Sequence, residues 1–290
     1  MVRPGTEPQI QCGRARSEIH SNIVYSAPAL AGGSKVELKM DIQVPETDGP
    51  KPLVVYVPGG GFAQAVKEGG LNSRTFVAEA GYVVASIQYR TTADRAVYTD
   101  ALADVRSAIS FLQANATQYG IDPARVGLWG ESAGGYLVAM TGLDPSVDVQ
   151  AVVEKFGLSD LTEVFADFDP ATQQSYAALD AAMGRFVLGP DSSAPLTRQA
   201  AAPANPATFA KAGGPPFLHL HGTADTLISP SQTLILHNAL RAARADSTRY
   251  LIDGAGHGDF TFTGDAATGL PWTTQQVMGL MTDFFAEHLG

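Results

Sequence analysis

Gly-Glu-Ser-Ala-Gly at residues 130–134 is the most informative stretch of this chain, because of the segments on either side of it. Residues 125–129 form a short apolar run that is typical of a buried strand, and residues 135–140 make a good helix opening. A serine on a sharp, glycine-lined turn between a strand and a helix is the setting of a nucleophile elbow. The alternative is an ordinary turn in which Ser132 only caps the helix.

The glycines around Ser132 favour a nucleophile. They allow the turn to hold a strained backbone conformation, and they let other backbone segments approach closely. The helix N-terminus beneath Ser132 would also offer free N–H groups and a partial positive charge, and both stabilise an anion. Ser132 is therefore the predicted nucleophile of a catalytic site.

Strand-like and helix-like segments alternate over most of the chain. We expect strands at residues 22–26, 36–44, 53–57, 82–88, 126–129, 150–155, 216–221 and 248–252. We expect helices at residues 72–80, 101–114, 132–141, 231–242 and 273–288. The later strands are almost continuously apolar, as strands buried on both faces of a parallel sheet should be. The pattern predicts an α/β fold with a mostly parallel, doubly wound sheet of about eight strands, whose first two strands pair antiparallel at one edge.

The chain divides into a short arm and one domain. Residues 1–18 are polar and are interpreted as an N-terminal arm, whereas residues 19–290 are long enough for a single α/β domain. Within this domain, residues 157–214 interrupt the alternation and are predicted to form a cap-like insertion. The insertion either covers the site with its aromatic side chains or only adds surface helices. Its aromatic residues include Phe165, Phe168, Tyr176 and Phe186.

The composition argues against several classes of partner and excludes some kinds of site. The 290-residue chain carries a formal net charge of −10, which argues against nucleic acid or an anionic membrane as partner. Its apolar runs are too short to span a bilayer. The single cysteine, Cys12, excludes an internal disulfide and a cysteine-based metal cluster. Residues 1–11 lack the apolar core of a signal peptide, which predicts a cytoplasmic protein, or a secreted one from which a signal has been removed.

A serine hydroxyl is a poor nucleophile at neutral pH and needs a base, which in turn needs an orienting acid. In the elbow arrangement the acid and the histidine follow the serine in that order. His257 is the predicted base, because it lies in a glycine-rich loop just after the last expected strand. His221 competes only weakly, since it precedes the predicted acid, and His219 lies within an apolar run that is typical of a packed core. The remaining histidines are His20, His237 and His288.

The predicted acid is Asp225, which ends the segment His-Gly-Thr-Ala-Asp at residues 221–225. This segment follows a strongly apolar strand, and catalytic groups gather at the carboxyl ends of parallel strands. Asp160 also follows an expected strand and is the second candidate. Either carboxylate could instead belong to a turn or a helix cap. Asp225 is preferred because the strand before it is the clearer one.

A run of glycines at residues 59–61 follows the expected strand at 53–57. Consecutive glycines leave their backbone N–H groups uncovered, so these groups can point at a negative charge that develops beside Ser132. The predicted oxyanion hole comprises Gly60, Gly61 and Ala133. The predicted substrate pocket includes the adjoining Phe62 and Glu131.

Taken together, these motifs resemble the α/β-hydrolase superfamily from about residue 20 to the end of the chain. They are most similar to small serine esterases of the hormone-sensitive-lipase-like and acetylxylan/feruloyl-esterase-like groups. Those esterases share a His-Gly-Gly-Gly-aromatic segment, a Gly-Glu/Asp-Ser-Ala-Gly-Gly elbow, a His-Gly-x-x-Asp loop, a Gly-x-x-His loop and a strand ending in Tyr-Arg. The matching segments here are residues 59–62, 130–135, 221–225, 254–257 and 82–90. Pro58 departs from the pattern, because it replaces a histidine that helps to hold the oxyanion loop.

The resemblance implies an α/β-hydrolase fold and a serine carboxylesterase that cleaves short-acyl or aryl esters through an acyl-enzyme, with no cofactor and no metal. The alternatives are a carbohydrate acetyl or feruloyl esterase, an arylformamidase, and, in another class, a non-catalytic binding protein that kept the fold. The predicted partner is a small-molecule ester, without nucleic acid or membrane, and the sequence allows a homodimer.

Overall fold

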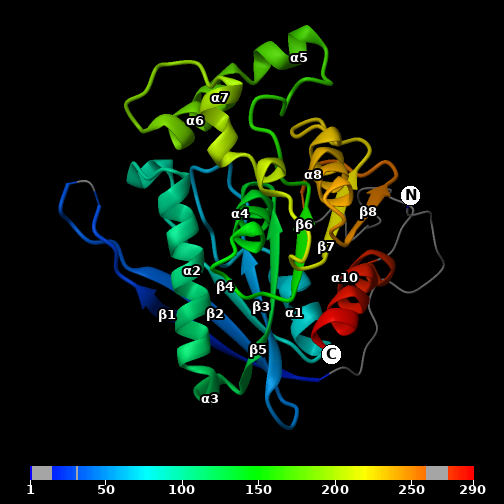
Figure 1. Cartoon of the computed structure of the whole chain (residues 1–290). Coiled ribbons are helices and arrows are strands. Elements are labelled where there is room, and N and C mark those ends of the chain that lie inside the picture. Colours follow the sequence, from blue (N-terminus) through cyan, green and yellow to red (C-terminus); the bar gives the residue numbers. More distant parts are fainter. Residues whose placement is uncertain (2–14, 31, 259–273) are drawn as a thin grey trace.

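The computed structural model describes residues 1, 15–30, 32–258 and 274–290 of the chain. These residues form an eight-stranded sheet in the strand order β1-β2-β4-β3-β5-β6-β7-β8, with helices on both faces (Figure 1). β1 pairs antiparallel with β2, and β2 pairs antiparallel with β4. The other neighbouring strands pair parallel. The predicted α/β fold, with a mostly parallel sheet and an antiparallel pair at one edge, is confirmed.

The expected strands are all present, although some of them are longer than predicted. Their bounds are β1 (Ser17–Ser26), β2 (Leu38–Pro45), β3 (Lys51–Val57), β4 (Val83–Ile87), β5 (Ile121–Glu131), β6 (Ala151–Lys155), β7 (Phe217–Gly222) and β8 (Ser247–Ile252). β1 starts at Ser17 rather than at residue 22, because polar side chains are tolerated on a strand that forms the edge of the sheet. Most of the predicted arm, residues 1–18, lies outside the described residues, and its last two residues belong to β1.

The main helices cover the two faces of the sheet. α1 and α10 pack on one face, and α2, α4 and α8 pack on the other. Neighbouring strand residues point to opposite faces, so Leu128 joins the cluster beneath α2 and α4 whereas Trp129 joins the cluster beneath α1 and α10. No helix among the described residues combines the length and the apolar character needed to cross a membrane. The bounds are α1 (Leu71–Glu79), α2 (Tyr98–Ala114), α3 (Ala116–Tyr119), α4 (Ala133–Leu143), α8 (Ser231–Ala242) and α10 (Thr274–Leu289).

The segment between β6 and β7 adds further helices at one end of the sheet, seen at the top of Figure 1. This segment corresponds to the insertion expected at residues 157–214. Its longest helix is α6, which contributes the buried side chains of Met183 and Phe186 to the same core cluster as α2 and α4. Its elements are α5 (Pro170–Ser175), α6 (Ala177–Leu188), α7 (Arg198–Ala201) and the 3₁₀ turns η2 (Ala202–Ala204) and η3 (Pro206–Phe209).

Two glycines allow α4 to cross closely over the ends of β3 and β5. A methyl group at Gly134 would overlap with the carbonyl oxygen of Val57, and one at Gly130 would overlap with the carbonyl oxygen of Gly134. Backbone atoms cannot move aside as a flexible side chain can, so only glycine fits at both positions. The glycines of the elbow therefore set how closely the helix approaches the sheet beneath Ser132.

Gly134→Ala should destabilise the protein by about 1–3 kcal/mol or more, because the added methyl group must push two backbone segments apart. Gly279→Ala is the matched control, since a methyl group at Gly279 in α10 would meet no atom of the described residues within 4 Å. Removing a helical glycine there should stabilise the protein by about 0.5–1 kcal/mol. Denaturant unfolding of both variants measures the difference. Equal midpoints would show that the close crossing is unimportant.

Candidate active site

Ser132 lies between β5 and α4 in a backbone conformation that is rare for a residue with a side chain. Its φ is 54° and its ψ is −121°. Its side chain makes no capping hydrogen bond to α4, which excludes the alternative that this serine serves as a helix cap. Instead, its Oγ lies 3.1 Å from Nε2 of His257. Its backbone N–H donates to the carbonyl oxygen of Lys155 at 3.0 Å, which ties the turn to the end of β6.

The three residues predicted to act together do lie together. Nδ1 of His257 is 2.8 Å from Oδ2 of Asp225, and Nε2 of the same ring faces Ser132. A charged carboxylate can only accept hydrogen bonds, so Nδ1 carries the proton and the Nε2 lone pair faces the serine hydroxyl. This arrangement can draw the proton from Ser132 as its oxygen attacks an electrophile.

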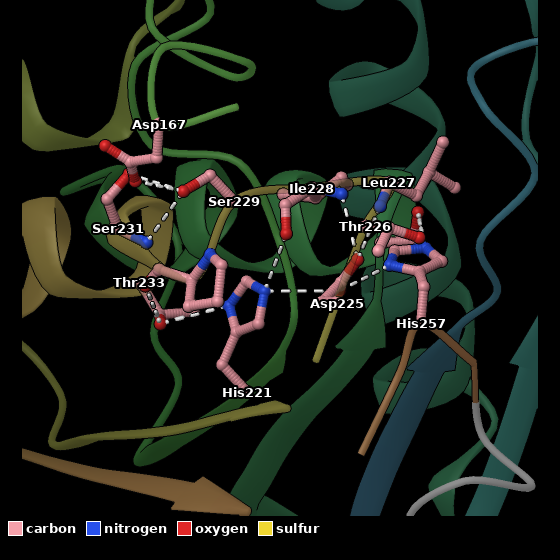
Figure 2. Close-up of polar contacts among 12 residues, drawn as sticks. Asp167, His221, Asp225, Thr226, Leu227, Ile228, Ser229, Ser231, Thr233 and His257 are labelled. Carbon is pink, nitrogen blue, oxygen red and sulfur yellow. Dashed lines mark hydrogen bonds and ion pairs between the residues drawn. The ribbon is translucent and has the colours of Figure 1, made fainter. Parts of the chain in front are cut away.

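The carboxylate of Asp225 is buried, with 3 % of its surface exposed, yet it is fully provided with hydrogen-bond donors. Its Oδ1 accepts from the backbone N–H groups of Leu227 and Ile228 at 2.9 and 3.0 Å. Burial raises the pKa of Asp225, but hydrogen bonds from His221 and His257 outweigh burial and hold this pKa well below its usual range. Asp225 therefore stays charged at neutral pH. Figure 2 shows it between the two histidines.

Asp160, the second candidate acid, stabilises a local turn instead of binding a histidine. Its Oδ1 accepts from the backbone N–H and hydroxyl of Thr162 at 3.0 and 2.7 Å, and from Nδ2 of Asn205 at 3.0 Å. These contacts form a local turn of the kind that short carboxylates often stabilise. The structure thus joins Asp225, not Asp160, to His257.

The two histidines of β7 are buried. His219 is fully buried and pairs with Glu154 at 2.5 Å, which confirms that it is a packed core residue. His221 lies in β7, within the strand expected at residues 216–221, and is fully buried. Its Nε2 is 3.2 Å from Oδ2 of Asp225. This contact was not predicted from the sequence, because it depends on where β7 ends and on how the chain turns back after it.

The glycine loop after β3 lies directly beside the nucleophile. An ideal Cβ atom at Gly59 would be 3.1 Å from Cβ of Ser132, so the loop approaches as closely as glycine allows. Gly60 and Gly61 have φ values of 142° and 58°, which are disfavoured for other residues. Ala133 is the first residue of α4, so its N–H group has no carbonyl partner within the helix.

Hydrogen bonds from the following segments hold the glycine loop, although Pro58 cannot act as the usual histidine does. The hydroxyl of Tyr89 donates to the carbonyl oxygen of Pro58 at 2.9 Å. Burial raises the pKa of Tyr89, so this hydroxyl keeps its proton. The backbone N–H and the hydroxyl of Thr92 donate to the carbonyl oxygen of Phe62 at 2.8 and 3.0 Å. The loop is therefore fixed at both ends.

Two cavities meet at Ser132. The first has a volume of about 240 Å³ and mainly apolar walls, which come from Phe62, from Leu179 and Met183 of the insertion, and from Leu227 and Ile228. The second has a volume of about 290 Å³, and His257 and Phe156 are among its lining residues. Ser132 and Gly61 border both cavities. A bound molecule could thus place one group on each side of the serine.

The insertion borders the first cavity with aliphatic side chains, and its aromatic residues pack elsewhere. Phe186 stacks on Phe62 with 4.3 Å between the ring centres, behind the cavity wall. Phe165 stacks on Tyr176 at 5.0 Å, and Phe168 lies against both rings. The four aromatic side chains therefore do not cover the site. On this side the first cavity is bordered instead by Leu158, Val164, Leu179 and Met183.

Glu131 borders the second cavity, but its carboxylate is engaged in the core. It pairs with Nζ of Lys155 at 2.9 Å and accepts from the hydroxyl of Tyr56 at 3.1 Å. The Lys155 side chain is completely buried, so this ion pair lies in a region of low dielectric constant. This ion pair joins the ends of β5 and β6 beside the elbow.

In the part of the chain that the structure describes, no group of three or more His, Cys, Asp and Glu side chains could hold a metal ion.

Comparison with known proteins connects this geometry to esterases. Residues 40–240 match the family model described as BD-FAE. The esterase LipC of Mycobacterium tuberculosis is 30% identical over 89% of this chain and 64% of its own length. The probable carboxylic ester hydrolase LipM of the same organism is 29% identical over 63% of this chain and 43% of its own length. The isoprenylcysteine alpha-carbonyl methylesterase ICME of Arabidopsis thaliana is 26% identical over 83% of this chain and 57% of its own length. The chain thus spans between 43% and 64% of the length of these relatives.

Solved structures of esterases share the fold. A bifunctional GH43-CE protein of Bacteroides eggerthii superposes with a TM-score of 0.72 and 27% identity, over 94% of this chain and 35% of that one. A truncated carbohydrate esterase from gut microbiota gives a TM-score of 0.69 and 22% identity, over 98% and 99%. Esterase 2 of Thermogutta terrifontis, with propionate bound, gives 0.69 and 22%, over 94% of each chain.

Asp225→Asn should lower ester turnover by about 10⁴-fold, because an amide favours the wrong tautomer of the His257 ring. Asp160→Asn is the matched control, since its amide oxygen can still accept within the local turn. We expect its turnover to remain within a few-fold of the wild type. Steady-state kinetics with one ester decides between the two carboxylates. A larger loss for Asp160→Asn would show that the wrong acid has been assigned.

Proposed function

The chain belongs to the BD-FAE family, and we propose that it is a serine carboxylesterase that hydrolyses short-acyl or aryl carboxylic esters through an acyl-enzyme. The observation that supports this proposal most strongly is the hydrogen-bonded series from Asp225 through His257 to Ser132. A serine beside a histidine that is oriented by a buried carboxylate has the geometry needed for acyl transfer. The names of the relatives agree with ester hydrolysis.

In the first half of the reaction, Oγ of Ser132 attacks the ester carbonyl carbon while Nε2 of His257 takes the hydroxyl proton. Asp225 holds the ring in place and stabilises the imidazolium that forms. The carbonyl oxygen becomes an oxyanion, and the N–H groups of Gly60, Gly61 and Ala133 are proposed to donate to it. Gly60 and Gly61 lie in a loop that is held at both ends, and Ala133 begins α4, so little movement of these groups is needed during the proposed reaction.

The second proton transfer determines which cavity holds which part of the substrate. His257 must return its proton to the leaving alcohol, so the alcohol lies on the His257 side, in the cavity of about 290 Å³. The acyl group then occupies the apolar cavity of about 240 Å³ on the other side of Ser132. After the alcohol leaves, water takes its place and His257 activates that water to release the acid.

The size and walls of the acyl cavity favour small groups. An apolar cavity of about 150 Å³ is enough to hold benzene, so 240 Å³ suits a short acyl chain or a single aromatic ring. Phe62 and Met183 border this cavity, and both are almost completely buried, so neither can swing into solvent. We therefore propose acetyl to butyryl esters as the preferred substrates and aryl esters such as feruloyl esters as the second choice.

Carbohydrate esters are the second candidate class, because one structural neighbour is a carbohydrate esterase by name. The arylformamidase alternative has no feature of the site in its favour. A non-catalytic binding protein would not need the hydrogen-bonded series at Ser132. A small ester is the proposed partner, and a homodimer and a cytoplasmic location stay predictions from the sequence.

Ser132→Ala should lower ester hydrolysis by about 10⁵- to 10⁶-fold while the fold is retained, since only one hydroxyl group is lost. The test is kcat/KM on a panel of acetyl, butyryl, octanoyl and feruloyl esters, with circular dichroism to confirm folding. A variant that retains near-normal rates would refute the proposed mechanism. A wild-type protein that cleaves none of these esters would favour the non-catalytic alternative.

Met183→Ala should shift the preference toward longer acyl chains, because it deepens the acyl cavity. Each additional methylene that gains apolar contact is worth about 0.8 kcal/mol, or roughly fourfold in kcat/KM. Leu234→Ala is the matched control, because Leu234 is 40 % exposed on α8 and does not border the cavity. The ratio of octanoyl to acetyl kcat/KM should rise in the first variant alone. A wild-type maximum at ten carbons or longer would refute the short acyl pocket.

A further inference from the structure

A second histidine contacts the acid of the proposed triad from the side opposite to His257 (Figure 2). The His221 side chain is completely buried, and its Nε2 lies 3.2 Å from Oδ2 of Asp225 and 3.1 Å from the carbonyl oxygen of Ile228. We propose that His221 is a positioning residue, which holds Oδ2 of Asp225 toward His257. This inference rests on the proposed esterase function and adds a fourth side chain to its machinery.

The contacts of His221 determine which of its nitrogens donates. Both partners of Nε2, the Asp225 carboxylate and the Ile228 carbonyl, can only accept, so Nε2 carries a proton. Nδ1 lies 3.1 Å from Oγ1 of Thr233, and that oxygen already accepts from Nε of Arg249 at 2.9 Å. The ring is therefore held on both edges, and its single Nε2–H is shared between the Ile228 carbonyl oxygen and the acid.

A count of donors shows why Asp225 needs this contact. Its Oδ1 has two backbone donors, the N–H groups of Leu227 and Ile228. Its Oδ2 has two side-chain donors, His257 and His221. Without His221, Oδ2 would be held only by the ring that it has to orient. Because the carboxyl group is buried, water cannot readily supply the missing donor, and an unsatisfied buried charge is costly.

The electrostatic environment agrees with this geometry. Burial raises the pKa of Asp225, and the hydrogen bond from His221 acts against burial together with the bond from His257. His221 thus helps to keep Asp225 charged, and a charged acid is what stabilises the imidazolium of His257 during turnover.

The test must distinguish an effect of His221 on Asp225 from an effect of His221 on the stability of the fold. The two can be confused because His221 also binds the carbonyl oxygen of Ile228, in the loop that follows Asp225. The four proteins of a double-mutant cycle make this separation: wild type, His221→Leu, Asp225→Asn and the double variant. Leucine fills similar space without a donor. Turnover of an activated aryl acetate is measured per folded active site, and thermal unfolding is followed in parallel.

We expect His221→Leu to lower kcat by about 10- to 100-fold with little change in KM, because a misplaced catalytic group slows chemistry rather than binding. In the Asp225→Asn background the same substitution should change kcat by less than about threefold, since the acid through which it acts is already disabled. His221→Gln, which keeps an N–H group at similar reach, should recover most of the activity. His237→Leu is the matched control on α8, where His237 binds Ser247 outside this network, and its kcat should stay near that of the wild type.

Independent, multiplicative losses in the double variant would overturn the inference, as would a glutamine variant no better than leucine. If His221→Leu does not fold, Thr233→Val and Thr233→Ser replace it, because valine removes the partner of Nδ1 and serine keeps it. The valine variant should then lose turnover and the serine variant should retain it, and equal values would refute the inference. Failure of the esterase proposal itself is recognised separately, because the wild type would show no turnover that depends on Ser132.

Discussion

Ser132 adopts a φ of 54° between β5 and α4, and this conformation directs its hydroxyl toward His257 instead of into the helix N-terminus. Such a conformation costs about 1–3 kcal/mol for a residue with a side chain. Close packing around the turn offsets this cost, because Gly130 and Gly134 allow α4 to pack directly against β3 and β5. The buried ion pair between Glu131 and Lys155 fixes the ends of β5 and β6 at the same place. The glycine loop after β3 packs against this turn, and His257, paired with Asp225, meets the serine hydroxyl that the turn presents.

The insertion contacts both the proposed acyl cavity and the loop that follows the proposed acid. Its Leu179 and Met183 form part of the proposed acyl cavity. Other residues of the same segment bind the loop that follows Asp225: the hydroxyl of Tyr176 donates to the carbonyl oxygen of Thr226 at 2.6 Å, and Ser229 donates a hydrogen bond to Asp167 (Figure 2). Because one segment carries both sets of contacts, a change in the insertion made to alter acyl preference can also move Asp225.

Much of the fold and of the candidate site could be predicted because the relevant signals are local. A few neighbouring residues are enough to recognise each of these features: the elbow at Ser132, the apolar strand before Asp225 and the glycines around His257. Contacts between distant segments could not be predicted. The support of Pro58 by Tyr89 and the packing of Phe186 on Phe62 depend on how the elements meet in space. The burial of His221 against Asp225 likewise depends on where β7 ends, and element ends are the least certain part of a pattern.

Covalent labelling with a fluorophosphonate tests the account most directly. Oγ of Ser132 should attack phosphorus and displace fluoride while His257 takes the proton. Intact-mass analysis and peptide mapping should find one adduct on Ser132 in the wild type, and His257→Ala should slow its formation by orders of magnitude. An adduct on another residue, or labelling of Ser132 at the same rate without His257, would contradict the assignment of these residues.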